Sequence, residues 1–569
     1  MIDAGVFFMA DCREQAVSND FFDFIISYVD TPFITVTSDC IQRIDEDYDI
    51  FYYAREGLPD LNVAGYSYEV IPKCFGLLDQ TALEASGILR MQNQPALRLR
   101  GNGVLVGFID TGIDYTNPLF RFSDGSTRIL SIWDQELQSG TPPQGILYGS
   151  VYRREEIDRA LLSDNPYELV PSRDENGHGT FLAGVAAGGE DVRADFIGAV
   201  PEASIAVVKL KEAKQYLKDF YFIPDGVPVY QENDIMLAVS YLNGLAMIYD
   251  MPLVICLGVG SSMGNHGRTG AVSTYLNYIC GRRKRCVVAA AGNEANARRH
   301  FQGELSAGMN YEDVQINVEQ DMRGFYVELW AKAPELYAVA VISPTGEQIP
   351  RVPVRAGASL EFRFVFEQTT VSVDCWSEPR ETASQLVYLR FKEPKQGIWI
   401  VRVFPQNVIT GNYHMWLPMQ QMTDGEVFFL RSNPDMTITD PGSATQVITP
   451  GGYNAANEAL YLNSGRGYTI DGEVKPDFVA PAVEVYGPGL RQNYVTYTGT
   501  SAAAALTAGA CAQIMQWGFV ELNEPRLSNA GIKNMLIRGA DRNNERSYPN
   551  REWGYGTLDV YQAFLNLRG

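Results

Sequence analysis

Four short apolar runs, separated by stretches with helical spacing, constrain the fold of this chain most strongly. Continuous apolar runs of strand length are typical of strands buried on both faces. One intervening stretch, Asp234–Leu242, has the periodicity of a helix. Strand–helix alternation predicts an α/β core, a parallel sheet with helices on both faces. The apolar runs are Val104–Ile109, Ser204–Lys209, Leu253–Leu257 and Cys286–Ala291.

Two segments differ from this core. Residues 1–80 carry fifteen acidic and only four basic residues, and Phe33–Thr37 and Ile50–Tyr53 have strand-like composition, so we expect a separate acidic α+β domain there. Residues 301–442 contain short β-branched and aromatic segments and no helical periodicity. This pattern predicts an antiparallel β-sandwich or jelly roll inserted into the α/β domain, which then comprises 81–300 and 443–569.

Three short motifs carry groups suited to nucleophilic catalysis. Asp110 follows the first apolar run, His178 lies between two glycines, and Ser501 starts a helical stretch of small residues. An aspartate after a strand or a serine before a helix is most often a cap when it stands alone. Together, the three supply a carboxylate, an imidazole and a hydroxyl in one chain.

The motifs D-T-G-I-D, H-G-T and G-T-S-A-A resemble the three signature blocks of the subtilisin (subtilase) superfamily of serine proteases, in the same chain order. The resemblance implies a catalytic triad of Asp110, His178 and Ser501. A fourth block, Ala290–Glu294, resembles the one that supplies the oxyanion-hole asparagine, here Asn293, which would act with the Ser501 N–H. The methionine and Pro-His usually found after the serine are replaced by Ala502, Ala505 and Leu506.

The resemblance also implies a substrate-binding surface. An extended peptide would lie against Leu257, Gly258, Val259 and Gly260, and the P1 pocket would be walled by Ala290, Ala291 and Gly292. These walls are small and uncharged, so they offer no fixed partner for a lysine or arginine side chain. No zinc-ligand pattern is present, and no calcium-binding loop stands out among the acidic residues. We therefore expect no cofactor, although the sequence leaves a structural calcium ion open.

The acidic first domain and the β insertion together resemble the Csp germination proteases of spore-forming anaerobes. That resemblance implies that residues 1–80 form a prodomain that folds the enzyme and stays bound non-covalently after autoprocessing between Gln80 and Thr81. It also implies limited proteolysis, such as activation of a zymogen of a spore-cortex hydrolase. The alternatives are a signalling or scaffold protein on a protease fold, a general intracellular protease, and, less favoured, a secreted degradative subtilisin.

Charge and composition bear on partners and location. The net charge of −22 disfavours nucleic acid and anionic membranes as partners, and no apolar run approaches the length of a membrane span. The first residues lack a basic segment and do not resemble a signal peptide. The eight scattered cysteines are expected to be reduced thiols. We expect a monomeric protein, cytoplasmic or spore-associated, that acts on protein or peptide substrates.

Overall fold

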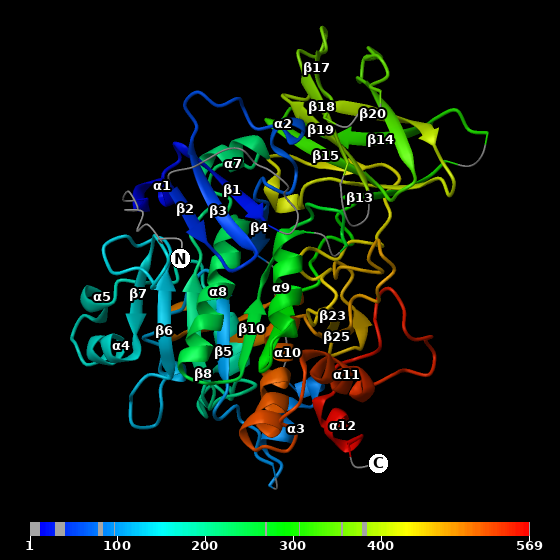
Figure 1. Ribbon diagram of the computed structural model, residues 1–569. Helices are drawn as coiled ribbons and strands as arrows, with labels where there is room; N and C mark the ends of the chain where they lie inside the picture. The colour runs from blue at the N-terminus through cyan, green and yellow to red at the C-terminus, as the bar shows by residue number, and fades with distance from the viewer. Residues whose placement is uncertain are drawn as a thin grey trace, which may run out of the picture.

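The computed structural model describes residues 12–28, 40–77, 84–95, 97–267, 270–305, 308–353, 357–377 and 384–567. Its centre is a six-stranded sheet in the order β12-β10-β5-β8-β6-β7, in which all neighbours are parallel except β6 and β7 (Figure 1). The four apolar runs predicted as strands form four of its members. The strands are β5 (Leu105–Asp110), β6 (Ile129–Asp134), β7 (Ser150–Arg153), β8 (Ser204–Lys209), β10 (Leu253–Leu257) and β12 (Arg285–Ala289).

Helices cover both faces of this sheet, as the sequence predicted. Along β5, Val106 and Phe108 join one hydrophobic core with α6 (His178–Ala187) and α10 (Thr500–Met515), whereas Leu105 and Ile109 join the core on the other face. The second face is covered by α8 (Glu232–Ile248) and α9 (Ala271–Gly281). Further helices of the α/β part are α3 (Ile88–Gln92), α4 (Arg154–Leu161), α5 (Pro166–Leu169), α7 (Gln215–Phe220), α11 (Asn529–Gly539) and α12 (Val560–Leu565).

The described part of the first 77 residues, here called the N-terminal unit (residues 12–77), contains a small antiparallel sheet in the order β1-β3-β2. Figure 1 shows this sheet, in blue, beside α7 and near the upper ends of α8 and α9. The strand expected over Phe33–Thr37 lies outside the described residues. The elements are α1 (Arg13–Val17), β1 (Phe21–Ser27), β2 (Cys40–Arg43), β3 (Tyr48–Ala54), α2 (Val63–Tyr66) and β4 (Cys74–Leu77).

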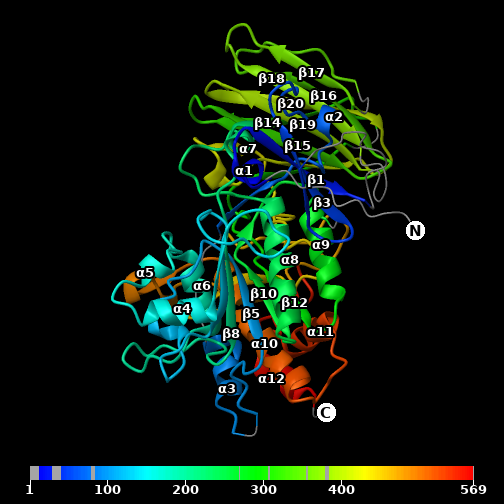
Figure 2. The same ribbon diagram turned by 60° about the vertical axis from the view of Figure 1, so that its left-hand side comes forward.

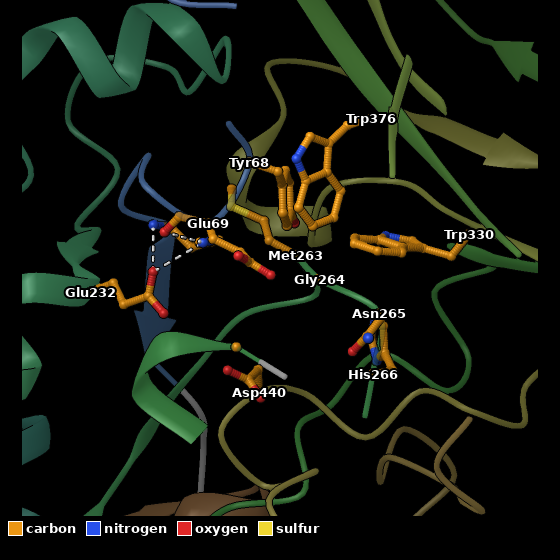
Figure 3. A pocket seen from close by; sticks show the side chains of 12 residues that line it. Tyr68, Glu69, Glu232, Met263, Gly264, Asn265, His266, Trp330, Trp376 and Asp440 are labelled. Atoms are coloured by element: carbon orange, nitrogen blue, oxygen red, sulfur yellow. Dashed lines mark hydrogen bonds and ion pairs between the residues drawn. The ribbon is translucent and has the colours of Figure 1, made fainter. Parts of the chain in front are cut away.

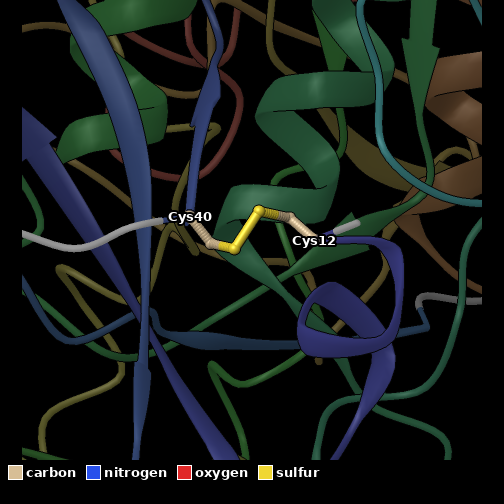
Figure 4. The surroundings of a disulfide bond; sticks show 2 residues. All are labelled: Cys12 and Cys40. Carbon is tan, nitrogen blue, oxygen red and sulfur yellow. A yellow bond between two sulfur atoms is a disulfide. The ribbon is translucent and has the colours of Figure 1, made fainter. Parts of the chain in front are cut away.

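Two of the eight cysteines are not reduced thiols, contrary to expectation. Cys12, just before α1, forms a disulfide with Cys40 at the start of β2 (Figure 4). Folding brings together two cysteines 28 positions apart, a proximity that no local spacing pattern shows. The other six cysteines form no disulfide, as predicted, and all six are buried.

The strands from His300 to Phe429 form two sheets that share one hydrophobic core, and we call this part the β module (residues 300–429). It lies at the end of the molecule opposite the C-terminal helices (Figure 2). Its two ends meet, since Phe429 N–H donates to the Arg298 carbonyl. The strands are β13 (His300–Glu304), β14 (Glu312–Val318), β15 (Gly324–Ala331), β16 (Leu336–Ile342), β17 (Ser359–Arg363), β18 (Thr370–Ser377), β19 (Gln385–Lys392), β20 (Gly397–Asn407), β21 (Asn412–Trp416) and β22 (Val427–Phe429).

Short strands complete the α/β part: β9 (Tyr230–Gln231), β11 (Val259–Gly260), β23 (Pro450–Asn454), β24 (Ala459–Leu460), β25 (Phe478–Pro481), β26 (Val485–Pro488) and β27 (Tyr494–Tyr497).

Within the described ranges, no helix combines the length and apolarity needed to span a membrane.

Candidate active site

Three elements bring the predicted catalytic residues together. Asp110 is the last residue of β5, His178 is the first residue of α6, and Ser501 lies in the first turn of α10. His178 Nδ1 is 2.7 Å from Asp110 Oδ1, and His178 Nε2 is 3.1 Å from Ser501 Oγ. All three residues are buried. The arrangement is a continuous carboxylate–imidazole–hydroxyl chain.

A backbone contact helps to hold the Asp110 carboxylate in position beside the imidazole. The Thr111 N–H donates to Asp110 Oδ1 at 2.8 Å, on the same oxygen that faces the imidazole. A carboxylate beside Nδ1 favours the tautomer with its proton on Nδ1, which leaves Nε2 free to accept the Ser501 hydroxyl proton. The geometry therefore suits removal of a proton from Ser501.

Asp174, which the sequence analysis did not identify, holds the loop before His178. Its Oδ1 accepts the Thr111 hydroxyl at 2.9 Å and the Gly177 N–H at 2.8 Å, and its Oδ2 accepts the N–H and hydroxyl of Thr180. Asp174 thereby connects the residue after Asp110 with the first turn of α6. An acidic residue shortly before a helix was the available sequence signal.

Asn293 follows β12 and lies beside the start of α10. Its Oδ1 accepts the Thr500 N–H at 3.1 Å and lies 3.2 Å from the Thr500 hydroxyl, which in turn accepts the Gly292 N–H at 3.0 Å. Because the amide oxygen is engaged with Thr500, the amide NH₂ of Asn293 remains as a donor. Thr500 is a second residue that the sequence analysis did not identify.

The expected substrate-binding residues lie beside these groups. Leu257 ends β10, Val259 and Gly260 form β11, and the Ala290 N–H donates to the Leu257 carbonyl at 3.3 Å. A Cβ added to Gly258 would come within 2.9 Å of both Asp110 Oδ2 and His178 Cε1. The structure thus places Gly258 directly against the carboxylate–imidazole pair.

The strand β11 is paired with the N-terminal unit. In an antiparallel register, Leu77 of β4 lies opposite Val259, and Gly76 lies opposite Gly260. The predicted cleavage residues Gln80 and Thr81 lie outside the described residues. Where the structure describes the chain, it contains no group of three or more histidine, cysteine, aspartate or glutamate residues that could hold a metal ion.

Comparison with solved structures identifies a close overall match to the CspB protease of Clostridium perfringens. The TM-score is 0.76 at 29% sequence identity, over 85% of this chain and 97% of that one.

Among curated proteins, the C5a peptidase of Streptococcus pyogenes serotype M1 is 21% identical over 504 residues, 82% of this chain. The match covers 39% of that peptidase's own length. The serine protease AprX of Bacillus subtilis strain 168 is 33% identical over 132 residues, 20% of this chain and 28% of AprX.

The model of the subtilase family matches residues 101–318 and 409–556. The two matched segments contain Asp110, His178, Asn293 and Ser501, and the gap between them falls inside the β module. The chain therefore belongs to the subtilase family.

Proposed function

We propose that this protein is a serine endopeptidase in which Asp110, His178 and Ser501 act as the catalytic triad. The observation that carries the proposal is the continuous chain of contacts, 2.7 Å from carboxylate to imidazole and 3.1 Å from imidazole to hydroxyl. A serine hydroxyl is a weak nucleophile until a neighbouring base accepts its proton, and His178 is in position to do so.

The steps follow from these positions. Ser501 Oγ attacks the scissile carbonyl carbon while its proton moves to His178 Nε2, and Asp110 stabilises the resulting imidazolium. The carbonyl oxygen becomes an oxyanion, held by the Ser501 N–H at the start of α10 and the Asn293 amide. The tetrahedral intermediate collapses, and the amine leaves with the proton from Nε2. Water then hydrolyses the acyl–Ser501 ester by the same proton transfers.

In this proposal the N-terminal unit is a prodomain whose strand β4 pairs with β11, where a substrate is expected to bind. Pairing of Leu77 with Val259 supports this role, since β11 is the strand against which an extended substrate is expected to lie. The bond proposed for autoprocessing is Gln80–Thr81, three residues beyond the end of β4. The uncharged side chain of Gln80 agrees with the uncharged walls expected for the P1 pocket.

Buried charged contacts support retention of the prodomain after cleavage. Asp23 pairs with Lys214 at 2.5 Å, and Lys73 pairs with Glu232 at 3.4 Å. The Tyr68 hydroxyl donates to Glu328 of the β module at 2.7 Å. These contacts link the N-terminal unit to Lys214 before α7, to Glu232 of α8 and to Glu328 of the β module without a covalent bond.

Figure 3 shows the junction at which the three parts of the chain meet. Tyr68 of the N-terminal unit lies against Trp376 of the β module, with Trp330 nearby and Glu232 of α8 on the opposite side. These rings form edge-on and tilted contacts with centroids 5.4–6.2 Å apart. A prodomain held by both other parts agrees with an enzyme made for limited proteolysis. By the Csp resemblance, the proposed substrate class is a zymogen of a spore-cortex hydrolase.

Labelling with a fluorophosphonate probe tests the proposed activity. We expect labelling of the wild type, none of Ser501→Ala, and normal labelling of Ser139→Ala, which removes an exposed serine. Peptide hydrolysis by Ser501→Ala or His178→Ala should fall roughly 10⁵–10⁶-fold, near the loss of about 2 × 10⁶ for the corresponding residues of subtilisin. Folded wild type that neither labels nor hydrolyses peptides would favour the alternative, a scaffold protein on a protease fold.

Intact mass and N-terminal sequencing test autoprocessing. Wild type should carry a new N-terminus at Thr81, and Ser501→Ala should remain a single chain. Cleavage at this bond in Ser501→Ala would contradict self-processing.

A further inference from the structure

Three of the four histidines of the chain gather on one tryptophan. Trp416, the last residue of β21, is buried and stacks on His266 with ring centroids 4.3 Å apart and planes inclined by 14°. His300 and His414 lie on the same ring at 4.9 and 5.4 Å. His266 comes from the loop after β11, so the stack joins the β module to the strand that pairs with β4.

Both partners of the closest stacked pair hold the same short segment, Met436–Asp440. The Trp416 Nε1–H donates to the Met436 carbonyl at 3.1 Å. His266 Nδ1 is 2.7 Å from the Ile438 carbonyl, and burial lowers the pKa of His266 to about 4, so the ring is neutral near pH 7. His266 Nε2 lies 3.1 Å from a second acceptor, the Ser262 carbonyl. A neutral ring has a single N–H, and the shorter contact assigns it to Nδ1, which donates to Ile438.

The segment Met436–Asp440 packs against the proposed P1 walls. The Thr439 N–H donates to the Ala291 carbonyl at 3.0 Å, and a Cβ added to Gly292 would come within 2.6 Å of Thr439 Oγ1. Asp440 pairs with Ser261, the residue after β11, through backbone bonds of 2.8 and 2.9 Å. The segment therefore bridges Ala291 on one wall and the end of the substrate strand on the other.

Thr439 places a polar hydroxyl group inside this packed segment. Its side chain is fully buried, and its hydroxyl has no hydrogen-bond partner among the described residues. A buried hydroxyl without a partner is unfavourable unless a ligand supplies one. The hydroxyl is packed against Gly292, so a shift of this segment would change the wall that Gly292 forms.

We propose that the stacked pair of His266 and Trp416 is a positioning device that sets the segment Met436–Asp440, and with it the P1 pocket. This inference rests on the proposed protease function. Through this stacked pair the β module affects substrate binding, since Trp416 belongs to β21. His266 and Trp416 touch no reacting group, so their effect falls on the affinity for substrate more than on the bond-breaking step.

The test compares two variants with a matched control, all in the full-length chain. Trp416→Phe keeps a stacked ring and loses the Nε1–H, and His266→Phe keeps a ring and loses Nδ1–H. His414→Phe changes the same stack, but His414 bonds to His300 and not to Met436–Asp440. Thermal unfolding of each protein measures the general loss of stability.

Kinetics with the peptide succinyl-Leu-Leu-Asp-Gln-p-nitroanilide, which has the sequence of residues 77–80, gives the first readout. We expect KM to rise about 2- to 13-fold for Trp416→Phe and His266→Phe, the factor that corresponds to the net contribution of one hydrogen bond. We expect kcat to stay within about twofold, and His414→Phe to match wild type in both constants. Equal kinetics in all three variants, or equal losses in all three, would overturn the proposal.

Amide hydrogen exchange supplies a readout that does not depend on activity. The amides of Thr437, Thr439 and Asp440 should exchange faster in Trp416→Phe and His266→Phe, and at the wild-type rate in His414→Phe. Unchanged exchange would refute the positioning role even if the wild type proved to hydrolyse no peptide. Faster exchange with an inactive wild type would instead reject the proposed protease function and keep the role of the stack in the fold.

Discussion

The hydroxyl of Thr500 lies 3.2 Å from the side-chain oxygen of Asn293, and this contact orients the amide beside Ser501. The same hydroxyl accepts the Gly292 N–H, so one side chain ties the nucleophile helix to the loop after β12. An amide can be flipped, and its orientation decides whether an oxygen or an NH₂ group faces a developing oxyanion. Thr500 therefore supports the proposed oxyanion site without touching the substrate.

Replacing Thr500 by valine should lower kcat about tenfold to a hundredfold, less than the loss of an oxyanion donor itself. The Gly292 N–H loses its acceptor, which costs about 1–3 kcal/mol of stability. Steady-state kinetics and thermal unfolding measure the two effects. Thr500→Ser is the matched control, because it keeps the hydroxyl, and it should retain most of the activity. If the serine variant were as impaired as the valine variant, the methyl group rather than the hydroxyl would be responsible.

Gly258→Ala should inactivate the enzyme by displacing the imidazole. The new Cβ would lie 2.4 Å from Leu182 Cδ1 and 2.9 Å from both Asp110 Oδ2 and His178 Cε1, all shorter than van der Waals contact. The Leu182 terminus can move, but displacement of His178 lengthens its contact with Ser501, and misplacement by about 1 Å can cost a hundredfold in rate. Peptide hydrolysis and fluorophosphonate labelling should both fall.

Gly244→Ala is the control for that substitution. Gly244 lies inside α8, and a Cβ added there would meet no atom within 4 Å, so alanine should stabilise the helix by about 0.5–1 kcal/mol and leave the kinetics unchanged. Wild-type activity in Gly258→Ala would show that the site accommodates the added methyl group without displacing His178.

The sequence predicted the elements whose patterns are local. The four apolar runs form four strands of the central sheet, and the stretch 234–242 lies within α8. Short strands with weaker alternation were harder to recognise. In the β module the sequence predicted short strands and an antiparallel sandwich, but not which strands pair, because local composition does not set the register between distant strands.

The site shows the same division between local and long-range information. Asp110, His178 and Ser501 each stand in a recognisable motif, and the resemblance supplied their expected order. Asp174 and Thr500 matter through contacts with residues 63 and 207 positions away, and such contacts leave no spacing pattern. The Cys12–Cys40 bond was likewise invisible, since a pair among eight cysteines follows from the fold and not from their count.

Opening the Cys12–Cys40 bond should loosen the N-terminal unit. A loop closed by two cysteines 28 positions apart corresponds to about 3–4 kcal/mol of stabilisation in the chain-entropy model. We expect Cys12→Ser to lower the thermal midpoint and to speed amide exchange in β1 to β3, with little change in α10. The control is Cys375→Ser, which alters a buried cysteine of the β module that forms no disulfide. Identical exchange in β1 to β3 with and without the disulfide would contradict this expectation.

Asp440 should make stability depend on pH in the direction opposite to that of an exposed carboxylate whose pKa is lowered by a hydrogen bond. Removal from water raises its pKa from 3.8 to about 6, although the hydroxyls of Ser273 and Ser443 donate to its Oδ1. A raised pKa means that the folded state binds the proton more tightly. Its contribution to stability is therefore complete below about pH 3.8 and is lost as the pH rises through about 6.

Asp440→Asn never ionises, and its Oδ1 can still accept both hydroxyls. Compared in a Ser501→Ala background to prevent self-digestion, this variant should gain thermal stability over its parent as the pH rises from 4 to 8, by at most about 3 kcal/mol. Asp250→Asn is the control. Asp250 is exposed and its pKa is lowered by the hydrogen bond from Lys284, so that variant should lose stability relative to its parent over the same range. If both variants changed in the same direction, burial would not govern the titration of Asp440.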